Sequence, residues 1–265
     1  MKTIKNPIAC TFIALVAVGL SVLAAQKSYA SSAKESRCFE LRTYYAAPGK
    51  LDELNARFRY HTLKLFAQHG ITSVGYWMPV DNPENKLIYL LAFPNREAAT
   101  NSWRNFMSDP EWKEVVKKTQ ANGKLTTKVE SIYLAPTGFS PAVTPSAAAE
   151  PRTFELRTYK TQPGKVSALL ARFRDHTVKL FAKHGMGQFG YFVPLDKDKG
   201  GDDTLIYLLI HKSQDAAAAS FTAFRADPTW MTAKAASEKD GPLTLPAPDG
   251  VKSVFMMPTN YSPSR

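Results

Sequence analysis

The sequence predicts an α+β protein made of two tandem ferredoxin-like domains, each with the element order β-α-β-β-α-β. The first observation is a duplication, because the hexapeptide Phe-Glu-Leu-Arg-Thr-Tyr at 39–44 returns at 154–159. The second is that well over half of the positions in 39–81 are identical in 154–196, without a gap. The third is a change of apolar period within each copy, from two in strands to three or four in helices. We therefore expect two copies of one small domain.

Alternation and turn residues define the first half of the domain. Residues 38–45 alternate around their apolar positions, which indicates a strand. A Pro-Gly turn at 48–49 follows, and apolar residues at three- and four-residue spacing then predict a helix over 51–69. Gly70 is expected to end this helix, and a second strand is predicted over about 72–78.

The second half of the domain completes the sheet. The segment Asp-Asn-Pro-Glu-Asn at 81–85 predicts a hairpin turn, and the apolar stretch 87–93 predicts a central strand. Asn95 is expected to cap a helix, and Asp-Pro at 109–110 to start another, with Asp as N-cap and Pro in the first turn. Residues 129–134 form the last expected strand.

A ferredoxin-like sheet carries helices on one face only, so its other face must be covered by something else. Two copies in one chain can pack their sheets face to face, which gives a barrel-type pseudo-dimer with a cavity between the sheets. The alternative is that each half pairs with a half of another chain, in a homodimer. Pattern alone leaves both arrangements open.

The N-terminal segment 1–30 is expected to be a signal peptide. Lys2 and Lys5 precede an uncharged apolar run over 8–25, and small residues precede a cleavage site after Ala30. The mature protein is thus predicted to be secreted or periplasmic, without a stable membrane span. A retained anchor helix is the alternative, because the run is close to the minimum length of a membrane span.

Composition divides the rest of the chain into three segments. The first domain is expected to cover 36–137 and the second 152–263, since the repeated elements lie inside these ranges. Between them, 138–151 is rich in Pro and small residues and lacks apolar periodicity, which is typical of a linker.

Charge and cysteine content limit the kinds of partner and chemistry. The formal net charge is +11, and it falls to +8 when the three lysines of 1–30 are removed. A basic surface favours anionic ligands or membrane surfaces, or serves only solubility, and the charges are too dispersed to predict nucleic-acid binding. Cleavage after Ala30 would leave Cys38 as the one cysteine, so an internal disulfide is excluded in the mature chain and one between chains stays open. The sequence contains no HExxH, paired-cysteine, phosphate-loop or nucleophile-elbow motif, and no metal site is predicted.

Polar residues on the first strand of each copy are the first candidate site. If Phe39, Leu41 and Thr43 face the helices, alternation places the intervening side chains inside the barrel. An acid, a guanidinium and a phenol on one face can hold a polar or anionic ligand, because Arg offers a planar fork to a carboxylate or phosphate. A purely structural Glu-Arg ion pair is the alternative. The candidates are Glu40, Arg42 and Tyr44 with Glu155, Arg157 and Tyr159.

Four of the five histidines form a repeated pair on the first helix of each copy: His61 with His69, and His176 with His184. Residues eight apart on a helix lie about 12 Å apart along its axis, so the two members of a pair cannot share a metal ion. His69 and His184 are expected to stabilise the last helical turn. His61 and His176 could act at a cavity mouth as a general base or a haem ligand.

Aromatic residues recur at equivalent positions and are expected to lie mostly in the core. Those on strands that point into the barrel could line an apolar pocket with a polar rim, which would suit an aromatic or lipid-like ligand. The ligand-binding candidates of this kind are Tyr76, Tyr89, Tyr191 and Tyr207.

These motifs together resemble the NIPSNAP family. The resemblance rests on the Phe-Glu-Leu-Arg-Thr-Tyr strand, the Pro-Gly turn, the His-containing first helix, the Gly-Tyr strand and Asp-Pro-Glu-Trp at 109–112, and both copies take part. It implies the dimeric α/β barrel superfamily. Related barrels include haem-handling proteins and cofactor-free monooxygenases that act on aromatic compounds, which is a likeness of fold.

Two functions follow as hypotheses. The first is a secreted binding or interaction module that holds a small hydrophobic or anionic ligand in the barrel, without a cofactor. The second is a cofactor-free monooxygenase- or isomerase-like enzyme, or a haem-handling protein. In that case the polar residues of the first strands, with His61 and His176, would supply the acid, base and orienting groups. A pocket with converging polar groups favours the enzyme, and an interior filled by side chains favours the module.

Overall fold

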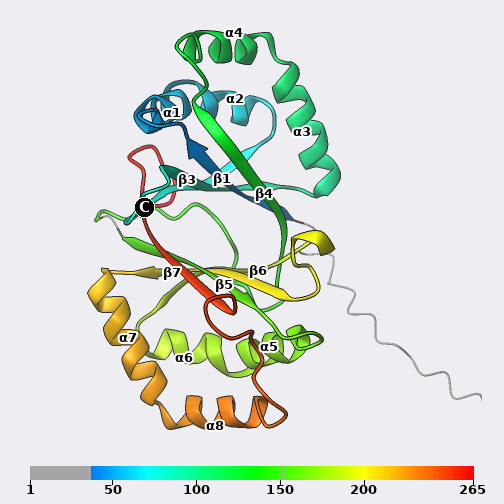
Figure 1. Ribbon diagram of the computed structural model, residues 1–265, viewed down its shortest axis with the longest axis vertical. Helices are drawn as coiled ribbons and strands as arrows, with labels where there is room; N and C mark the ends of the chain where they lie inside the picture. The colour runs from blue at the N-terminus through cyan, green and yellow to red at the C-terminus, as the bar shows by residue number, and fades with distance from the viewer. Residues whose placement is uncertain (1–36, 151) are drawn as a thin grey trace, which may run out of the picture. The chain divides into compact units, whose positions relative to one another are not determined.

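The computed structural model describes residues 37–150 and 152–265, so the expected signal peptide lies outside the described residues. In the first copy each predicted element is present within a few residues of its expected bounds (Figure 1). Its elements are β1 (Cys38–Ala46), α1 (Leu51–Arg57), the π-helix η1 (Phe58–Thr62), α2 (Leu63–Gln68), β2 (Thr72–Pro79), β3 (Lys86–Phe93), α3 (Arg96–Ser108), α4 (Pro110–Thr119) and β4 (Thr126–Pro136).

The second copy repeats this order and adds one short helix. Its elements are β5 (Thr153–Lys160), α5 (Val166–Arg172), the π-helix η2 (Phe173–Thr177), α6 (Val178–Lys183), β6 (Gly187–Pro194), the 3₁₀ turn η3 (Lys197–Lys199), β7 (Thr204–His211), α7 (Gln214–Ala226), α8 (Pro228–Ser237) and β8 (Val251–Pro258).

Helix starts and stops follow the expected capping chemistry. The Asn95 side chain accepts a hydrogen bond of 2.8 Å from the backbone N–H of Ala98 at the start of α3. Asp109 accepts from two backbone N–H groups in the first turn of α4, where Pro110 has no N–H group that would need an acceptor. Gly70 ends the first helix with φ +72°, a left-handed conformation that glycine adopts without steric cost.

The eight strands form one closed barrel within a single chain. Their order is β1-β3-β2-β8-β5-β7-β6-β4, so each four-stranded sheet joins the other at both edges. The last strand of each copy makes the junction: β4 pairs with β6 between Leu134 and Pro194, and β8 pairs with β2 between Pro258 and Trp77. The pseudo-dimer expected from the sequence is therefore confirmed, and closure removes the free sheet edges that would invite pairing with other chains.

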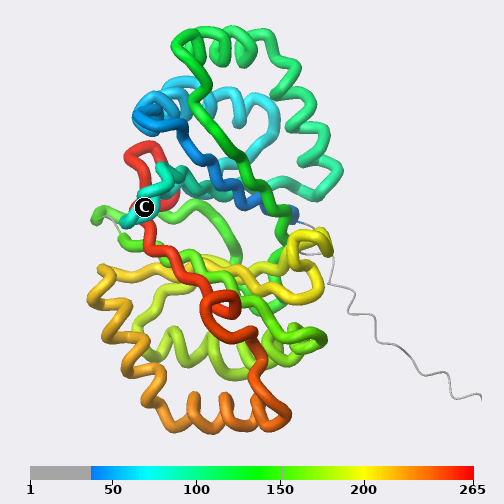
Figure 2. The backbone as a smooth tube through the Cα atoms, viewed as in Figure 1, coloured from blue at the N-terminus to red at the C-terminus, as the bar shows by residue number. Residues whose placement is uncertain are grey.

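Each copy also extends a short tail over the other copy. After β8, the backbone N–H of Thr259 donates to the Tyr76 carbonyl, and the Ser262 hydroxyl accepts from the Tyr76 N–H at 2.9 Å. After β4, Thr137 and Ser140 make the same two contacts with Tyr191. The beginning of the expected linker is thus a structural strap, and the chain trace shows the C-terminal tail beside the first copy (Figure 2).

Residues 37–150 and 152–265 contain two kinds of core. The barrel interior is apolar and draws on both copies, with Phe39, Trp77 and Ile88 packed against Phe154 and Phe192. On the outer side of each sheet, a separate core lies under helices α1–α4 or α5–α8 (Figure 1). Both faces of every sheet are therefore buried.

The first helix of each copy contains a π-helical turn at the same place. Thr62 and Thr177 lie at its end, and each hydroxyl donates to the carbonyl five residues earlier, on Arg57 or Arg172, at 3.2 Å. π-helical turns of this kind are rare in proteins, and many of the known examples lie at functional sites. Both arginines lie at the start of the bulge and are buried under the last helix of their copy.

Candidate functional site

The polar trio of the first strand faces the helices, so the expectation that it projects into the barrel is wrong. Glu40 is fully buried and accepts a 2.6 Å hydrogen bond from the indole N–H of Trp103 on α3. The Arg42 guanidinium lies 4.4 Å from the centroid of the Trp103 ring, and the Tyr44 ring packs on Phe58 of the first helix. The same orientation holds for Glu155, Arg157 and Tyr159 in the second copy. On this side Trp103 and Ser131 donate hydrogen bonds to Glu40, whereas an apolar cluster fills the barrel interior.

The buried carboxylate is satisfied in both copies, but by different third partners. In each copy the arginine two residues later and a serine of the last strand donate to it, from Ser131 to Glu40 and from Ser253 to Glu155. Trp103 completes the first set, whereas Phe221 stands at that place in the second copy. There His211, which replaces the first copy's Phe93, bonds Glu155 at 2.9 Å. In both copies a structural ion pair thus lies in a network that satisfies the buried carboxylate, although the Nε of Arg42 has no hydrogen-bond partner.

The charge of Glu155 is stabilised by these neighbours. Burial by itself raises the pKa of the Glu155 carboxyl, but the hydrogen bond from His211, the charge of Arg157 and the hydrogen bond from Ser253 outweigh burial and lower it below the ordinary value. The residue is therefore held ionised, which suits an anchor and not a proton-accepting base.

The four tyrosine candidates of β2, β3, β6 and β7 also lie in the helix-facing layers. Tyr76 stacks on Tyr89 and Tyr191 on Tyr207, with centroids 5.3 Å apart in both pairs. All four are fully buried, and burial raises the pKa of each phenol. They do not point into the barrel, which corrects the expected location. Their role as ligand contacts stays a prediction.

The histidines divide as the helix pattern indicated. His69 and His184 are hydrogen-bonded to the N-cap aspartates of the last helices, Asp109 at 2.6 Å and Asp227 at 2.8 Å, so each ties the end of the first helix to the start of the last one. His61 and His176 are exposed. His61 lies beside a surface groove of the first copy, and a catalytic or haem-binding role for either residue stays a prediction.

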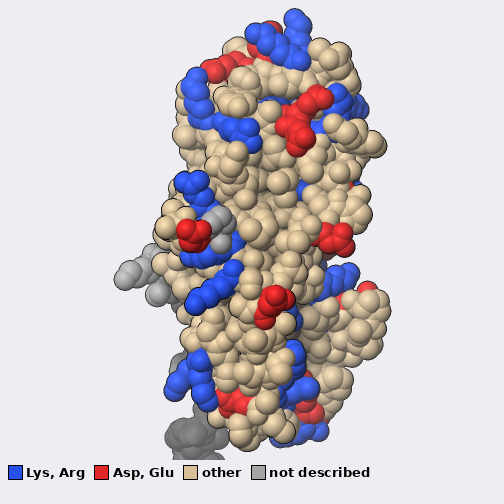
Figure 3. All heavy atoms as spheres, turned by 90° about the vertical axis from the view of Figure 1, so that its left-hand side faces the viewer, with Lys and Arg blue, Asp and Glu red and all other residues tan. Residues whose placement is uncertain are grey.

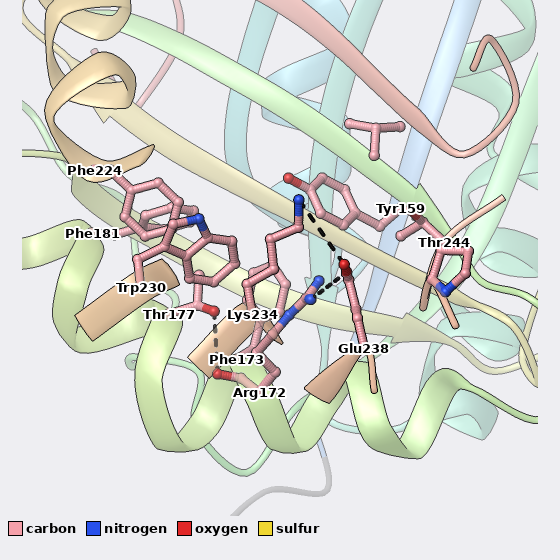
Figure 4. A pocket seen from close by; sticks show the side chains of 12 residues that line it. Tyr159, Arg172, Phe173, Thr177, Phe181, Phe224, Trp230, Lys234, Glu238 and Thr244 are labelled. Carbon is pink, nitrogen blue, oxygen red and sulfur yellow. Dashed lines mark hydrogen bonds and ion pairs between the residues drawn. The ribbon is translucent and has the colours of Figure 1, made fainter. Parts of the chain in front are cut away.

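A cavity of about 310 Å³ lies between the sheet and the helices of the second copy (Figure 4). Aromatic rings of Phe181, Phe224 and Trp230 gather at one end, and charged side chains of α5 and α8 lie at the other. The full lining consists of Tyr159, Arg172, Phe173, Thr177, Phe181, Phe224, Trp230, Lys234, Glu238, Pro242, Thr244 and Val251. The cavity thus has an apolar wall and a polar rim, although it is outside the barrel.

The rim of this cavity is an ion-pair cluster around Glu238. Arg172 donates to the Glu238 carboxylate at 2.7 Å and to the Ser237 hydroxyl at 3.2 Å, while its guanidinium lies 5.2 Å from the centroid of Trp230. Lys234 is 4.0 Å from the same carboxylate and half exposed. Two cations thus face one anion, which leaves the rim positive and favours an anionic group of a ligand.

Tyr159 connects the cavity with the network on the first strand. Its ring forms part of the cavity wall, and its hydroxyl accepts a 3.2 Å hydrogen bond from Arg157. Sequence reasoning singled out Tyr159 but missed Arg172, Lys234 and Glu238. A usable signal was present, because an arginine beside a core phenylalanine recurs at 57–58 and 172–173 on the apolar side of a predicted helix.

Several other features bear on chemistry. Cys38 is buried, and burial raises the pKa of its thiol to about 11, so it is a poor nucleophile. Among residues 37–150 and 152–265, no three His, Cys, Asp or Glu side chains come together as metal ligands. In the same part of the chain no helix is long and apolar enough to cross a membrane. On the face in Figure 3, basic and acidic side chains are interspersed.

Comparison with solved structures identifies the fold. A candidate monooxygenase from Lactobacillus acidophilus NCFM has a TM-score of 0.54 and 11% identity, over 84% of this chain and 94% of its own. An anthrone oxidase-like protein has a TM-score of 0.54 and 13% identity, over 86% and 94%. A NIPSNAP-like domain protein from Burkholderia xenovorans, 22% identical with a TM-score of 0.38, covers 43% of this chain and 97% of its own. A search of curated proteins gave no match. The first two share the dimeric α/β barrel fold.

The sequence motifs of both copies point the same way. The profile of the NIPSNAP family matches residues 39–141 and again 154–263, which together make up most of the chain. The two matches coincide with the two structural copies. This protein therefore belongs to the NIPSNAP family, as a tandem form whose two domains close one barrel.

Proposed function

We propose that the protein is a binding protein for a small aromatic ligand that carries an anionic group. The cavity of the second copy is the observation that carries this proposal, because it combines an aromatic wall with a positive rim. Its volume of about 310 Å³ is at the lower end for small-molecule sites. The barrel interior, where the ligand was first expected, is instead occupied by packed apolar side chains.

The contacts of the cavity suggest how a ligand would be held. A flat ring can pack against Phe181, Phe224 and Trp230, where ring–ring contacts add to the burial of apolar area. Lys234 can then reach the anionic group, since its distance of 4.0 Å from Glu238 is too long for a strong bond. We also propose that this binding takes place outside the cytoplasm, which the pattern of residues 1–30 supports.

The test is calorimetric titration of the purified protein with 2-naphthoate, and with 2-naphthol as its uncharged analogue. We expect 2-naphthoate to bind more tightly than 2-naphthol. Lys234→Met should weaken 2-naphthoate about fivefold, in keeping with a partly exposed ion pair of about 1 kcal/mol. Lys239→Met, which removes an exposed charge nearby, is the control. Absence of 2-naphthoate binding, or equal affinity in both variants, would show that the cavity is not the site.

A cofactor-free oxygenase is the second candidate, and one contact favours it. Tyr159 places a phenol that is hydrogen-bonded by Arg157 in the wall of an aromatic cavity, where it could orient an enolisable aromatic substrate. The likeness to the anthrone oxidase-like protein concerns the fold alone. Oxygen uptake with anthrone, abolished by Tyr159→Phe, would support this activity. No uptake above the uncatalysed rate would leave binding as the function.

A further inference from the structure

Arg57 in the first copy is a buried cation that pairs with no carboxylate of the described residues. Its side chain is only 6% exposed, and it makes no hydrogen bond or ion pair with another described residue. Its nearest compensation is the Trp112 ring, whose centroid lies 5.4 Å from the guanidinium. A desolvated guanidinium with free donors is unfavourable unless an anion completes the site.

The second copy shows what such an anion would do. Arg172 occupies the equivalent place and has the same exposed fraction of 6%. It forms an ion pair of 2.7 Å with the Glu238 carboxylate. Gln120 replaces Glu238 in the first copy. Both residues are the C-cap of the last helix, with φ/ψ of −112°/11° and −109°/13°, so the two side chains start from the same backbone conformation. The first copy thus has the same cation without the internal carboxylate.

Arg57 also opens onto a groove of the first copy. A cavity of about 240 Å³ lies between the first helix and the end of α4, and Arg57, Tyr60, His61 and Lys118 are among its lining residues. The one acidic residue of the lining, Glu53, is already paired with Lys50 at 2.7 Å. The groove is therefore cationic, and a small molecule can reach the guanidinium from solvent.

We propose that the first copy binds the carboxylate of a small organic acid at Arg57, where the second copy supplies its own carboxylate from Glu238. Arg offers two parallel N–H donors that match the two oxygens of a carboxylate. The two copies thus differ in function: one arginine is satisfied internally and the other is open to a ligand. This site is separate from the cavity of the second copy and does not depend on its function.

The experiment is an NMR titration that follows the arginine Nε–Hε signals of the full chain, with benzoate as the probe. Arg57→Lys identifies the Arg57 signal. We expect benzoate to shift this signal equally in the wild type and in Lys234→Met, whereas any shift at Arg172 belongs to the second-copy cavity and should weaken in that variant. Inorganic phosphate is the second probe. If phosphate alone binds, the assignment to carboxylates is wrong, and if neither probe shifts the signal, there is no anion site.

Substitution at position 120 gives the decisive comparison. Gln120→Glu installs the carboxylate of the second copy, which should lower benzoate affinity at least tenfold and raise the melting temperature without ligand. Gln120→Met is the matched control and should keep the affinity, because it adds no charge. Conversely, Glu238→Gln should strengthen the response of the Arg172 signal to benzoate, because it removes the internal carboxylate. Unchanged benzoate affinity in Gln120→Glu would overturn the proposal. Lys234→Met should leave benzoate binding at Arg57 intact, which distinguishes this site from the second-copy cavity.

Discussion

The buried glutamate of each copy has a different hydrogen-bond donor on its helix-facing side, and this difference leads to a specific prediction about stability. In the first copy the Trp103 indole donates to Glu40 at 2.6 Å, and in the second copy His211 donates to Glu155 at 2.9 Å. Phe93 occupies the position of His211 in the first copy. We therefore expect Trp103→Phe to be destabilising by itself and to be rescued by Phe93→His.

The magnitude follows from the burial of Glu40, which is 0% exposed. A hydrogen bond to a charged group contributes about 1.5–3 kcal/mol when its loss leaves the group buried. Trp103 is half-buried, so the smaller Phe ring adds about 0.5–1 kcal/mol of lost packing. Trp103→Phe should thus lower the free energy of unfolding by about 2–4 kcal/mol. The double variant should recover at least about 1 kcal/mol relative to additivity.

Urea denaturation, followed by circular dichroism, measures these free energies for the two single variants and the double variant. Trp112→Phe is the control, because the indole N–H of Trp112 donates to no described carboxylate and the change affects only ring contacts, with Phe106 and with Arg57. If the two substitutions are additive, or if Trp103→Phe costs no more than Trp112→Phe, the indole is not needed to satisfy Glu40. The reasoning from partner exchange would then be refuted.

Two further predictions concern packing and pH. A Cβ at Gly75 would lie 2.2 Å from a buried Trp ring, so Gly75→Ala should cost about 1–3 kcal/mol in urea denaturation, whereas Gly138→Ala, with nothing within 4 Å, should be neutral. Lys183 and His184 lower the pKa of Asp227, so its contribution to stability is complete above the unfolded pKa of about 4 and is lost as pH falls toward the folded value. Asp227→Asn should therefore reduce the dependence of the urea midpoint on pH between pH 5 and 2.5. An unchanged dependence would contradict this assignment.

The sequence by itself determined the duplication, the element order and the helix caps. Period, turn residues and caps such as Asn95 are local, so they can be read without knowing what packs against them. The pairing of two sheets also followed, because a ferredoxin-like sheet with one bare face requires a cover. The closure of the barrel within one chain was one of two open arrangements, since strand pairing between distant edges leaves no local pattern.

Only the tertiary structure decided which side of the first strand carries the polar trio. Alternation assigns the side chains of a strand to two faces, but it does not determine which face packs against the helices. Here both faces are buried, one under helices and one inside the barrel. Glu40 faces the helices because Trp103 and the neighbouring strand supply its partners there. Arg172 and Glu238 are more than sixty positions apart, and helix packing brings them together. Whether the equivalent Arg57 finds such a partner also depends on helix packing. Such a contact has no signature within either segment.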